Sequence, residues 1–386
     1  MNNKRIIFRF LVLPFLVALL LPYTAKTWMF EHHLVKLYYL LVTSLMTFGL
    51  VPLFYKLGMI MDITDKPGGR HIHERITPRT GGIAIYITFI ITLNLVTKPP
   101  REFTGLFWAS SIVALTGILD DIRHIPATIK FCAQILATFI LIKYGIVLSF
   151  FPHHLIGDVL SIVLTFGWVL GITNAYNCLD GLDGLAAGLA IIILFFYTVI
   201  ATGLVSDPFM AIVGLIMMGA IAGFMPYNFR IGKRAMIFLG DAGSTFIGFT
   251  LAALSIYGSW GITKSVDLVI PVLLLAVPIA DMIMTTITRI MDGKVKSFRQ
   301  WLAYGGNDHF HHRLLFLGLK PWGSVIIIWI FTILMGLLSL LLKSGDLKEA
   351  LVAILIALII FCLLIALMIF EDRMEIKRNS GKKTVS

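Results

Sequence analysis

Hydrophobic residues occur along this chain in long uninterrupted runs, separated by short polar segments or segments containing glycine and proline. A helix needs about 20 apolar residues to cross roughly 30 Å of hydrocarbon, and the runs have that length. The pattern therefore predicts twelve membrane-spanning helices, with the polar segments as loops. The expected spans are residues 6–24, 34–57, 82–97, 104–119, 127–150, 159–177, 184–204, 209–227, 243–260, 267–290, 323–343 and 349–370.

Composition agrees with this division. Hydrophobic residues make up 58% of the chain, charged residues only 14%, and the mean hydropathy is +0.91, which excludes a water-soluble protein. We expect an all-α, polytopic membrane helix bundle with no separate globular domain. Residues 1–33 would hold an N-terminal signal anchor, because Lys4 and Arg5 precede an apolar run that lacks a small-residue cleavage site. Residues 34–370 would form the membrane domain, and residues 371–386 a basic tail.

The net charge of +11 does not indicate a nucleic-acid-binding protein, because the basic residues are scattered over many loops. If the amino terminus is cytoplasmic, most of the 32 Lys and Arg residues lie on the cytoplasmic side, as the positive-inside rule requires. Five unusual polar segments fall on the same side, which predicts one composite site built from several loops. They are Asp65 to Gly82, Asp120 with Asp121, Asn174 to Gly188, Asn228 to Ser244, and Asp308 to Arg313.

Paired carboxylates are the first chemical signal. Asp120 and Asp121 stand at the carboxyl end of a predicted helix, where they oppose the helix dipole and repel one another. A bound cation, or a base with a raised pKa, would offset that cost, whereas the simpler alternative is an exposed helix end. Lys130 enters the next span and either reaches a phosphate or extends its ammonium group to the membrane surface.

Further acidic and amide residues follow in glycine-rich turns. The spacing of Asp180 and Asp183 predicts that both lie on one side of a helical turn, with Asn177 one turn earlier. Such hard oxygen ligands favour Mg²⁺ or Mn²⁺ over zinc. Asp241 lies in a third acidic turn, where an ordinary helix cap is the alternative. Asn228 is either a site residue or the end of a span.

Basic residues and histidines complete the pattern. Three histidines, His309, His311 and His312, together with Arg313, favour anion binding, since the zinc patterns of histidine and cysteine spacing are missing from the sequence. The earlier loop adds Arg70 and Arg79. Carboxylates for a divalent cation beside cationic groups for anions are typical of phosphoryl transfer, and the position at the lipid edge indicates a lipid substrate.

Asp281 lies inside a predicted span, where a carboxylate is costly. We expect it to pack against a polar partner rather than to act on a substrate.

With these segments in their order, the chain resembles the polyprenyl-phosphate N-acetylhexosamine 1-phosphate transferases of glycosyltransferase family 4. It is most similar to the bacterial branch that moves GlcNAc 1-phosphate from UDP-GlcNAc to undecaprenyl phosphate, an early membrane step of cell-surface glycan synthesis that is sensitive to tunicamycin. The resemblance implies that Asp120 and Asp121 serve the lipid phosphate, and that Asn177 and Asp241 hold Mg²⁺. It further implies that Lys130 lies near the phosphates, that Asp180, Asp183 and Phe238 face the nucleotide, and that His309 to Arg313 close over the diphosphate or sugar.

The resemblance leaves several points open. The span at 6–24 is extra relative to the usual eleven, and the segment from Gly293 to Asp308, which reads the sugar in this family, departs from the usual sequence. UDP-GalNAc or a modified UDP-N-acetylhexosamine is therefore the alternative donor. The reaction can be direct or can pass through an aspartyl intermediate. A twelve-span transporter is the rival interpretation, although it would place ionisable residues near span centres. We expect a bacterial plasma-membrane protein with a cytoplasmic active site, and a homodimer is compatible with the family.

Overall fold

The computed structural model describes residues 23–66, 76–96, 99–203, 206–258, 260, 264–297, 300–301, 304, 306, 308–344 and 348–362. The chain divides into two compact units, residues 1–260 and residues 261–386, and each is described by itself. The expected signal anchor at 6–24, apart from its last two residues, lies outside the described residues, as do Arg70 and the basic tail. The all-α architecture predicted from the apolar runs is confirmed.

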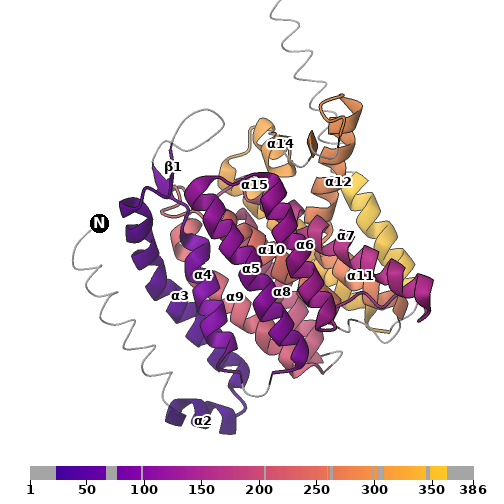
Figure 1. Cartoon of the computed structure of the whole chain (residues 1–386), viewed down its shortest axis with the longest axis horizontal. Helices are drawn as coiled ribbons and strands as arrows, with labels where there is room; N and C mark the ends of the chain where they lie inside the picture. The colour runs from indigo at the N-terminus through magenta and orange to yellow at the C-terminus, as the bar shows by residue number, and fades with distance from the viewer. Residues whose placement is uncertain are drawn as a thin grey trace, which may run out of the picture. The chain divides into compact units, whose positions relative to one another are not determined.

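The first unit contains a helix for every expected span between residues 34 and 260 (Figure 1). A two-stranded antiparallel pair, β1 (Thr64–Asp65) and β2 (Thr77–Pro78), follows α3, with Thr64 opposite Pro78. The helices are α2 (Tyr23–Glu31), α3 (Val35–Ile60), α4 (Gly81–Leu93), α5 (Arg101–Arg123), α6 (Ala127–Lys143), α7 (Leu155–Leu179), α8 (Leu185–Gly203), α9 (Pro208–Asn228) and α10 (Gly240–Tyr257).

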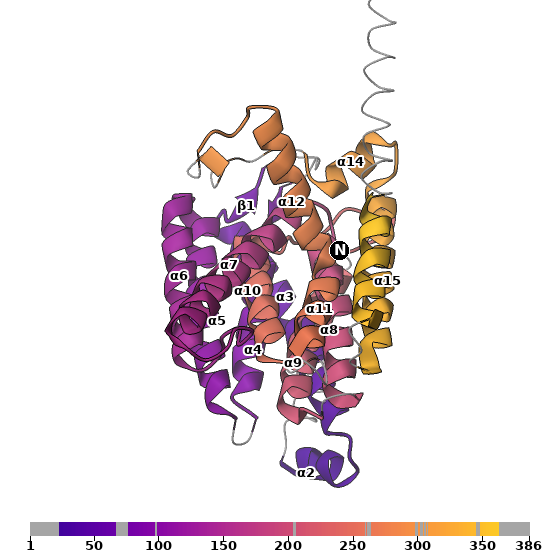
Figure 2. The ribbon, with the colours of Figure 1, turned by 90° about the vertical axis from the view of Figure 1, so that its right-hand side faces the viewer.

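Helix α10 is the centre of the first unit. It packs against α4, α5 and α7, while α9 packs against α3 and α8 (Figures 1 and 2). Every residue of α10 from 242 to 255 is buried, because the helix is apolar or small on all sides and is enclosed by its neighbours. The first turn of α10 is therefore held in a fixed place among the ends of the surrounding helices.

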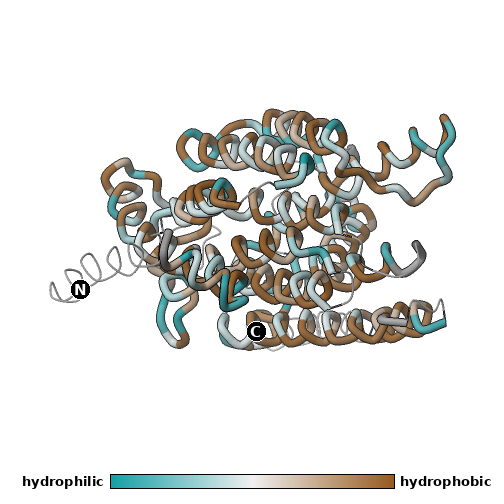
Figure 3. The backbone as a smooth tube through the Cα atoms, turned by 90° about the horizontal axis from the view of Figure 1, so that it is seen from below, coloured by the Kyte–Doolittle hydropathy of each residue, from teal (hydrophilic) through white to brown (hydrophobic). Residues whose placement is uncertain are grey.

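The outer surfaces of the helices are apolar, as expected of a membrane protein. Leu155, Ile156 and Val163 on α7 are more than half exposed, and the backbone is hydrophobic along most helices, with hydrophilic residues gathered toward helix ends and loops (Figure 3). Among the described residues, six helices are long and apolar enough to cross a membrane, namely α3, α5, α7, α8, α9 and, in the second unit, α15 (Pro321–Leu340). Twelve full-length spans were expected, and several of the predicted ones are shorter helices, such as the 13 residues of α4.

The second unit contains α11 (Lys264–Leu274), α12 (Ala276–Met291), α14 (Phe310–Phe316), α15 (Pro321–Leu340) and the 3₁₀ turn η1 (Leu341–Ser344). Residues 348–362 are also helical. The span expected at 267–290 is broken into two helices, because α11 and α12 meet at Leu275 with a bend of 72°. Pro278 explains the break: it has no N–H to give to the carbonyl of Leu274, and it fits the first turn of a new helix.

Two other boundaries differ from the prediction. Helix α2 lies where a loop was expected. Helix α6 ends at Lys143 and does not continue to residue 150, because Gly145 adopts a left-handed conformation with φ of 99°. The N–H groups of Gly145 and Ile146 then bond to the carbonyls of Ile142 and Leu141, which is the Schellman arrangement that ends many helices.

Candidate active site

Asp121, near the carboxyl end of α5, caps the amino terminus of α10. Its Oδ1 accepts a hydrogen bond from the N–H of Asp241 at 3.0 Å, and its Oδ2 accepts one from the N–H of Ala242 at 2.9 Å. The first N–H groups of a helix have no partner within the helix, and the helix dipole favours a carboxylate there. Asp121 is thus the residue that holds the start of α10, which carries Asp241, against α5.

Two glycines allow α10 to approach its neighbours this closely. A Cβ atom on Gly117 of α5 would lie 2.6 Å from the Cα of Ala242, and one on Gly82 of α4 would lie 2.2 Å from the N of Gly243. Both contacts are with backbone, which cannot rotate away as a side chain can. The first turn of α10 is therefore wedged between α4 and α5, and any larger residue at either position must displace it.

Lys130 of α6 bridges two carboxylates. Its Nζ donates to Oδ2 of Asp120 at 2.7 Å and to Oδ2 of Asp241 at 2.8 Å. The Oδ1 of Asp120 also accepts the N–H of Ile125, in the turn where His124 takes a left-handed conformation and ends α5. One cation is thus placed between acids from α5 and α10. The sequence left open whether Lys130 reaches the site or the membrane surface, and the structure places its ammonium group in the site.

The carboxyl end of α7 meets the same turn of α10. Asn177 Oδ1 accepts a hydrogen bond from the Oγ of Ser244 at 2.5 Å, so its amide oxygen faces α10. Asn174, one turn earlier, donates instead to Gln134 Oε1 of α6 and to the carbonyl of Leu170. Only Asn177 of these two amides therefore lies beside the first turn of α10.

Asp180 and Asp183 do not lie on a helix, contrary to the prediction. Helix α7 ends at Leu179, Asp180 caps it, and α8 begins at Leu185, so the two acids occupy an irregular turn. Gly184 in this turn has φ of 81°, whereas every residue of a right-handed helical turn has a negative φ. Asp183 Oδ2 accepts the N–H of Ala235 at 2.8 Å and thereby ties the turn to the loop before α10.

Burial, and after it the nearby charges of Asp241, Asp121 and Asp183, raise the pKa of Asp180 to about 8, while Arg79 acts in the opposite direction. A carboxyl group without a direct cationic partner is easier to bury in its neutral form. Asp180 is thus one member of a closely spaced acidic group at this end of the bundle.

Asn228, through its side chain, and Phe238, through its backbone, connect the loops around the start of α10 by hydrogen bonds to backbone groups. The side chain of Asn228 accepts the N–H of Gly184 at 2.8 Å and donates to the carbonyl of Ile237 at 3.0 Å. Phe238 donates its N–H to the carbonyl of Pro78, and its own carbonyl accepts the N–H of Gly81. The sequence left Asn228 as either a substrate-binding site residue or the end of a span, and the structure shows that its amide joins the turn at Gly184 to the loop at Ile237.

Arg79 lies directly after β2, at the same end of the first unit. Its guanidinium is 3.3 Å from Oδ2 of Asp65 on β1, and a quarter of its side chain is exposed. Its carbonyl oxygen lies close to Gly240, whose φ of 72° requires a residue without a side chain. The loop from Asp65 to Gly82 is therefore joined to the start of α10, as the composite site required.

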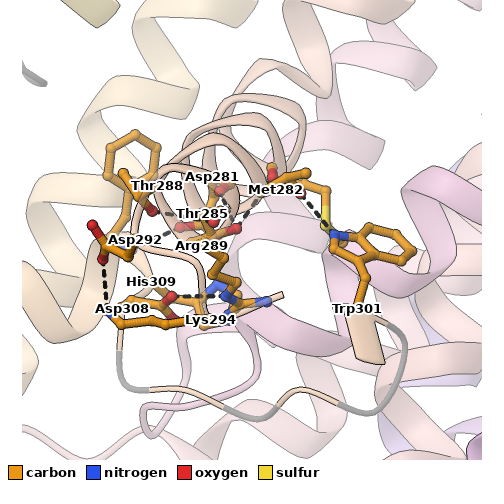
Figure 4. A network of polar contacts seen from close by, with 12 residues as sticks. Asp281, Met282, Thr285, Thr288, Arg289, Asp292, Lys294, Trp301, Asp308 and His309 are labelled. Atoms are coloured by element: carbon orange, nitrogen blue, oxygen red, sulfur yellow. Dashed lines mark hydrogen bonds and ion pairs between the residues drawn. The ribbon is translucent and has the colours of Figure 1, made fainter. Parts of the chain in front are cut away.

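The histidine segment belongs to the second unit and forms its own polar network with α12 (Figure 4). Asp281 is buried and accepts from His309 Nδ1 at 2.6 Å and from the N–H of Phe310 at 2.7 Å. Arg289, 3% exposed, donates to both carboxylate oxygens of Asp308 at 2.7 Å. The expectation that Asp281 packs against a polar partner is confirmed.

Two imidazoles of this segment, His311 and His312, carry little positive charge. Burial lowers the pKa of His311 well below its usual value, and burial also lowers that of His312. The ordinary value near 6.5 already leaves a histidine mostly neutral at pH 7. In the described part of the second unit, the positive charge of this segment thus lies on the guanidinium groups of Arg289 and Arg313 and not on His311 or His312.

Comparison with known proteins agrees with this arrangement. Residues 103–259 match the model of the glycosyl transferase family 4, a range that contains Asp120, Lys130, Asn177 and Asp241. Over 347 residues the chain is 31% identical to a probable undecaprenyl-phosphate N-acetylglucosaminyl 1-phosphate transferase of Bacillus subtilis, covering 88% of this chain and 93% of the relative. This chain belongs to the glycosyl transferase family 4.

Other members of the family carry related names. A decaprenyl-phosphate N-acetylglucosaminephosphotransferase of Mycobacterium leprae is 30% identical over 75% of this chain and 79% of its own length. The undecaprenyl-phosphate alpha-N-acetylglucosaminyl 1-phosphate transferase of Escherichia coli K12 is 24% identical over 88% of this chain and 95% of its own length. The family membership makes this chain a multi-pass membrane transferase and not a transporter.

The residues of this family member that could hold a cation are Asp241 and Asn177. In the described residues, no three His, Cys, Asp or Glu side chains form a preassembled metal cluster. Mg²⁺, however, is commonly held by one or two protein oxygens, with water and substrate phosphate as its other ligands. Asp241 and Asn177 supply two such oxygens from adjoining turns, so the donor set fits a hard divalent cation.

Several residues that shape the site in the first unit or the polar network in the second unit had not been assigned a role from the sequence. Gly82 and Gly117 have no reactive side chain. A glycine in an apolar run does not reveal close helix packing, because the sequence does not show which helix lies against it. Arg289 was not distinguished from the other Lys and Arg residues of the chain. Its position eight residues after Asp281, two turns along the same helix face, was the available signal.

Proposed function

We propose that this chain transfers N-acetylglucosamine 1-phosphate from UDP-GlcNAc to undecaprenyl phosphate. An oxygen of the lipid phosphate attacks the phosphorus next to the sugar and forms a new phosphoanhydride bond. The existing anhydride bond of the nucleotide breaks, and UMP leaves with the bridging oxygen. The products are undecaprenyl diphosphate N-acetylglucosamine and UMP, and any proton on the attacking phosphate must be removed.

The observation that carries this proposal is the placement of Lys130 between Asp120 and Asp241. A cation held by two carboxylates at the end of apolar helices attracts a phosphate, and the acids remain close enough to accept its proton or hold a metal. Phosphoryl transfer depends mainly on positioning and charge neutralisation, and these side chains supply both. The lipid acceptor fits the setting, because the exposed surface of the surrounding helices is apolar.

The geometry divides the work of the paired aspartates. Both oxygens of Asp121 accept backbone N–H groups of α10, so we propose that Asp121 positions Asp241 and does not attack or take a proton. Asp120 would keep the lipid phosphate deprotonated, with Lys130 orienting it. This assignment favours direct attack of the lipid phosphate over an intermediate on Asp121.

The cation in this proposal is Mg²⁺, with Mn²⁺ as the alternative. Asp241 and Asn177 would hold it, and it would neutralise charge on the diphosphate as the anhydride bond breaks. Asp180, Phe238 and Arg79 would serve the nucleotide side of the first unit. We further propose that the protein lies in a bacterial plasma membrane with this end of the bundle toward the cytoplasm, where sugar nucleotides are made.

The test is transfer of labelled sugar phosphate to undecaprenyl phosphate by the full-length protein in detergent, with a panel of UDP-sugars and with Mg²⁺ or EDTA. We expect labelled lipid from UDP-GlcNAc, inhibition by tunicamycin, and loss of roughly 10²-fold or more in Asp241→Asn, since a charge clamp contributes about that factor. Asp62→Asn, a solvent-exposed aspartate paired with Lys66, is the matched control and should keep its activity.

Absence of transfer with every donor would refute the function, and full activity of Asp241→Asn would refute the assigned site. Exchange of labelled UMP into UDP-GlcNAc without lipid acceptor separates the two routes. Direct attack predicts no exchange, whereas an aspartyl intermediate predicts exchange that disappears in the variant of the attacking aspartate.

A further inference from the structure

His309 lies in a continuous hydrogen-bonded chain in the second unit (Figure 4). Its Nδ1 is 2.6 Å from Asp281 Oδ2, and its Nε2 is 3.0 Å from the Nη2 of Arg289. A guanidinium N–H can only donate, so Nε2 must accept and cannot carry a proton. The proton is therefore on Nδ1, where it is donated to the carboxylate, and the ring is neutral.

This assignment uses both polar atoms of the ring. A neutral imidazole has one N–H and one lone pair, and in His309 the first is given to Asp281 and the second receives Arg289. The residue is also buried, with 5% of its surface exposed. The N–H and the lone pair of His309 are therefore both engaged within the protein, by Asp281 and by Arg289, rather than by a substrate or a metal.

The partners of His309 hold the start of α14. Asp281 accepts, besides His309, the N–H of Phe310, the first residue of that helix, at 2.7 Å. Arg289 binds Asp308 through two parallel hydrogen bonds, and its guanidinium lies 4.6 Å from the ring centre of Tyr304. The two α12 residues are eight positions apart, so they lie on one face of the helix and grip consecutive residues before α14.

We propose that Asp281, His309 and Arg289 form a clamp that fixes α14 on α12, and that His309 is a positioning residue rather than one that touches substrate. The groups that this clamp would present are His312 and Arg313, which follow on α14 and are only partly buried. The consequence for activity rests on the function proposed above. The clamp itself is a property of the second unit and can be tested separately.

The direction of the hydrogen bonds that connect Asp281, His309 and Arg289 gives a sharp test. A glutamine at position 309 offers one donor and one acceptor, spaced like the two ring nitrogens, but it cannot ionise or transfer a proton. Asp281→Asn keeps the size and the acceptor for Phe310 N–H, yet it turns an N–H toward the His309 N–H. If the proton of the ring moves to Nε2, this N–H faces the N–H of Arg289 instead. In either tautomer of His309, two hydrogen-bond donors therefore face each other.

We expect His309→Gln to keep its melting temperature and its activity to within about threefold, because the donor and acceptor pattern is preserved. His309→Ala and Asp281→Asn should melt several degrees lower and lose at least roughly tenfold in kcat, because small displacements of a binding group are costly. Asp292→Asn, the same substitution at an exposed site paired with Lys294, is the matched control and should change neither.

Spectroscopy measures the clamp without an activity assay. Solid-state NMR of ¹⁵N-histidine protein, compared with His309→Gln to assign the signal, should show His309 with a protonated Nδ1 and an unprotonated Nε2. A doubly protonated ring or the opposite tautomer would overturn the proposal. So would a His309→Gln variant with wild-type melting temperature but the activity of His309→Ala, or an Asp281→Asn variant with wild-type stability.

Failure of the proposed function has a different signature. In that case the wild-type protein transfers no sugar phosphate, while the order of melting temperatures and the histidine tautomer still support or overturn the clamp.

Discussion

Gly117→Ala tests the idea that the first turn of α10 must lie tightly against α5. The added Cβ would be 2.6 Å from the Cα of Ala242, 2.7 Å from the carbonyl oxygen of Asp241 and 2.8 Å from the N of Ala242. Ordinary van der Waals contact begins at 3.4 Å, so the turn must move by 3.4 − 2.6 = 0.8 Å. All three atoms are backbone, and the displacement cannot be absorbed by a side-chain rotation.

The displacement would stretch or break short hydrogen bonds and an ion pair at the first turn of α10. The Asp121 carboxylate bonds to the N–H groups of Asp241 and Ala242 at 3.0 and 2.9 Å, and Lys130 contacts Asp241 at 2.8 Å. Overpacking of a well-packed interface costs about 1–3 kcal/mol. A misplacement of about 1 Å in a catalytic arrangement can cost about 10²-fold in rate. We therefore expect a moderate loss of stability and a large loss of transfer.

The assay is steady-state transfer of labelled N-acetylglucosamine phosphate in detergent, with melting temperature and Mg²⁺ dependence measured on the same preparations. The matched control is Gly167→Ala on α7, where an added Cβ meets nothing within 4 Å. We expect kcat of Gly117→Ala to fall by about 10²-fold, its requirement for Mg²⁺ to rise, and Gly167→Ala to behave as wild type. Near wild-type kcat in a folded Gly117→Ala protein would refute the reasoning.

Lys130→Gln should lose at least about 10²-fold in activity and lower the melting temperature in EDTA, because Asp120 and Asp241 lose their shared cation; equal melting in EDTA would contradict this. Asp121→Asn should melt lower than wild type by a few degrees, since an amide can accept only one of the two α10 N–H groups, an order-of-magnitude effect of about 1–3 kcal/mol measured by thermal unfolding. Burial raises the pKa of Asp180 from near 3.8 to about 8, so the contribution of Asp180 to stability is fully present below about pH 4 and is lost as the pH rises through 8. In EDTA, Asp180→Asn should therefore melt higher than wild type at pH 8 and converge with it at pH 4, and a constant difference across that range would exclude the titration. Asn228→Asp should lower the melting temperature, because a carboxylate oxygen would face the carbonyl of Ile237 in place of an N–H donor; unchanged melting would show that this contact does not hold the loops.

Most of the helical architecture was predictable because apolar length is a local property. Each expected span from residue 34 to residue 260 became a helix, since about 20 residues without water must satisfy their backbone hydrogen bonds internally. The helix boundaries that differ from the prediction also have local causes, but each depends on a single residue. Pro278 breaks the expected span at 267–290, and Gly145 ends α6 early, and neither signal outweighs the hydrophobicity of the surrounding run.

The candidate site was predictable in composition but not in the role of each side chain. Asp120, Lys130, Asn177 and Asp241 were identified from their types and from the topology that places their loops on one side. The structure joins them in the first unit, as expected. A carboxylate in a sequence, however, shows the same signal whether it caps a helix, as Asp121 does, or contacts a cation.

That this protein is a helical membrane protein of this family can be read from the chain alone, because span length, composition and motif order are properties of the linear sequence. The roles of Asp121, Asn228 and His309 could be assigned only from the packed helices, because they depend on donors and acceptors in other segments of the chain. A hydrogen bond depends on distances of a few ångströms between residues far apart in the chain. The sequence pattern does not give those distances, because they are fixed only when the helices pack against one another.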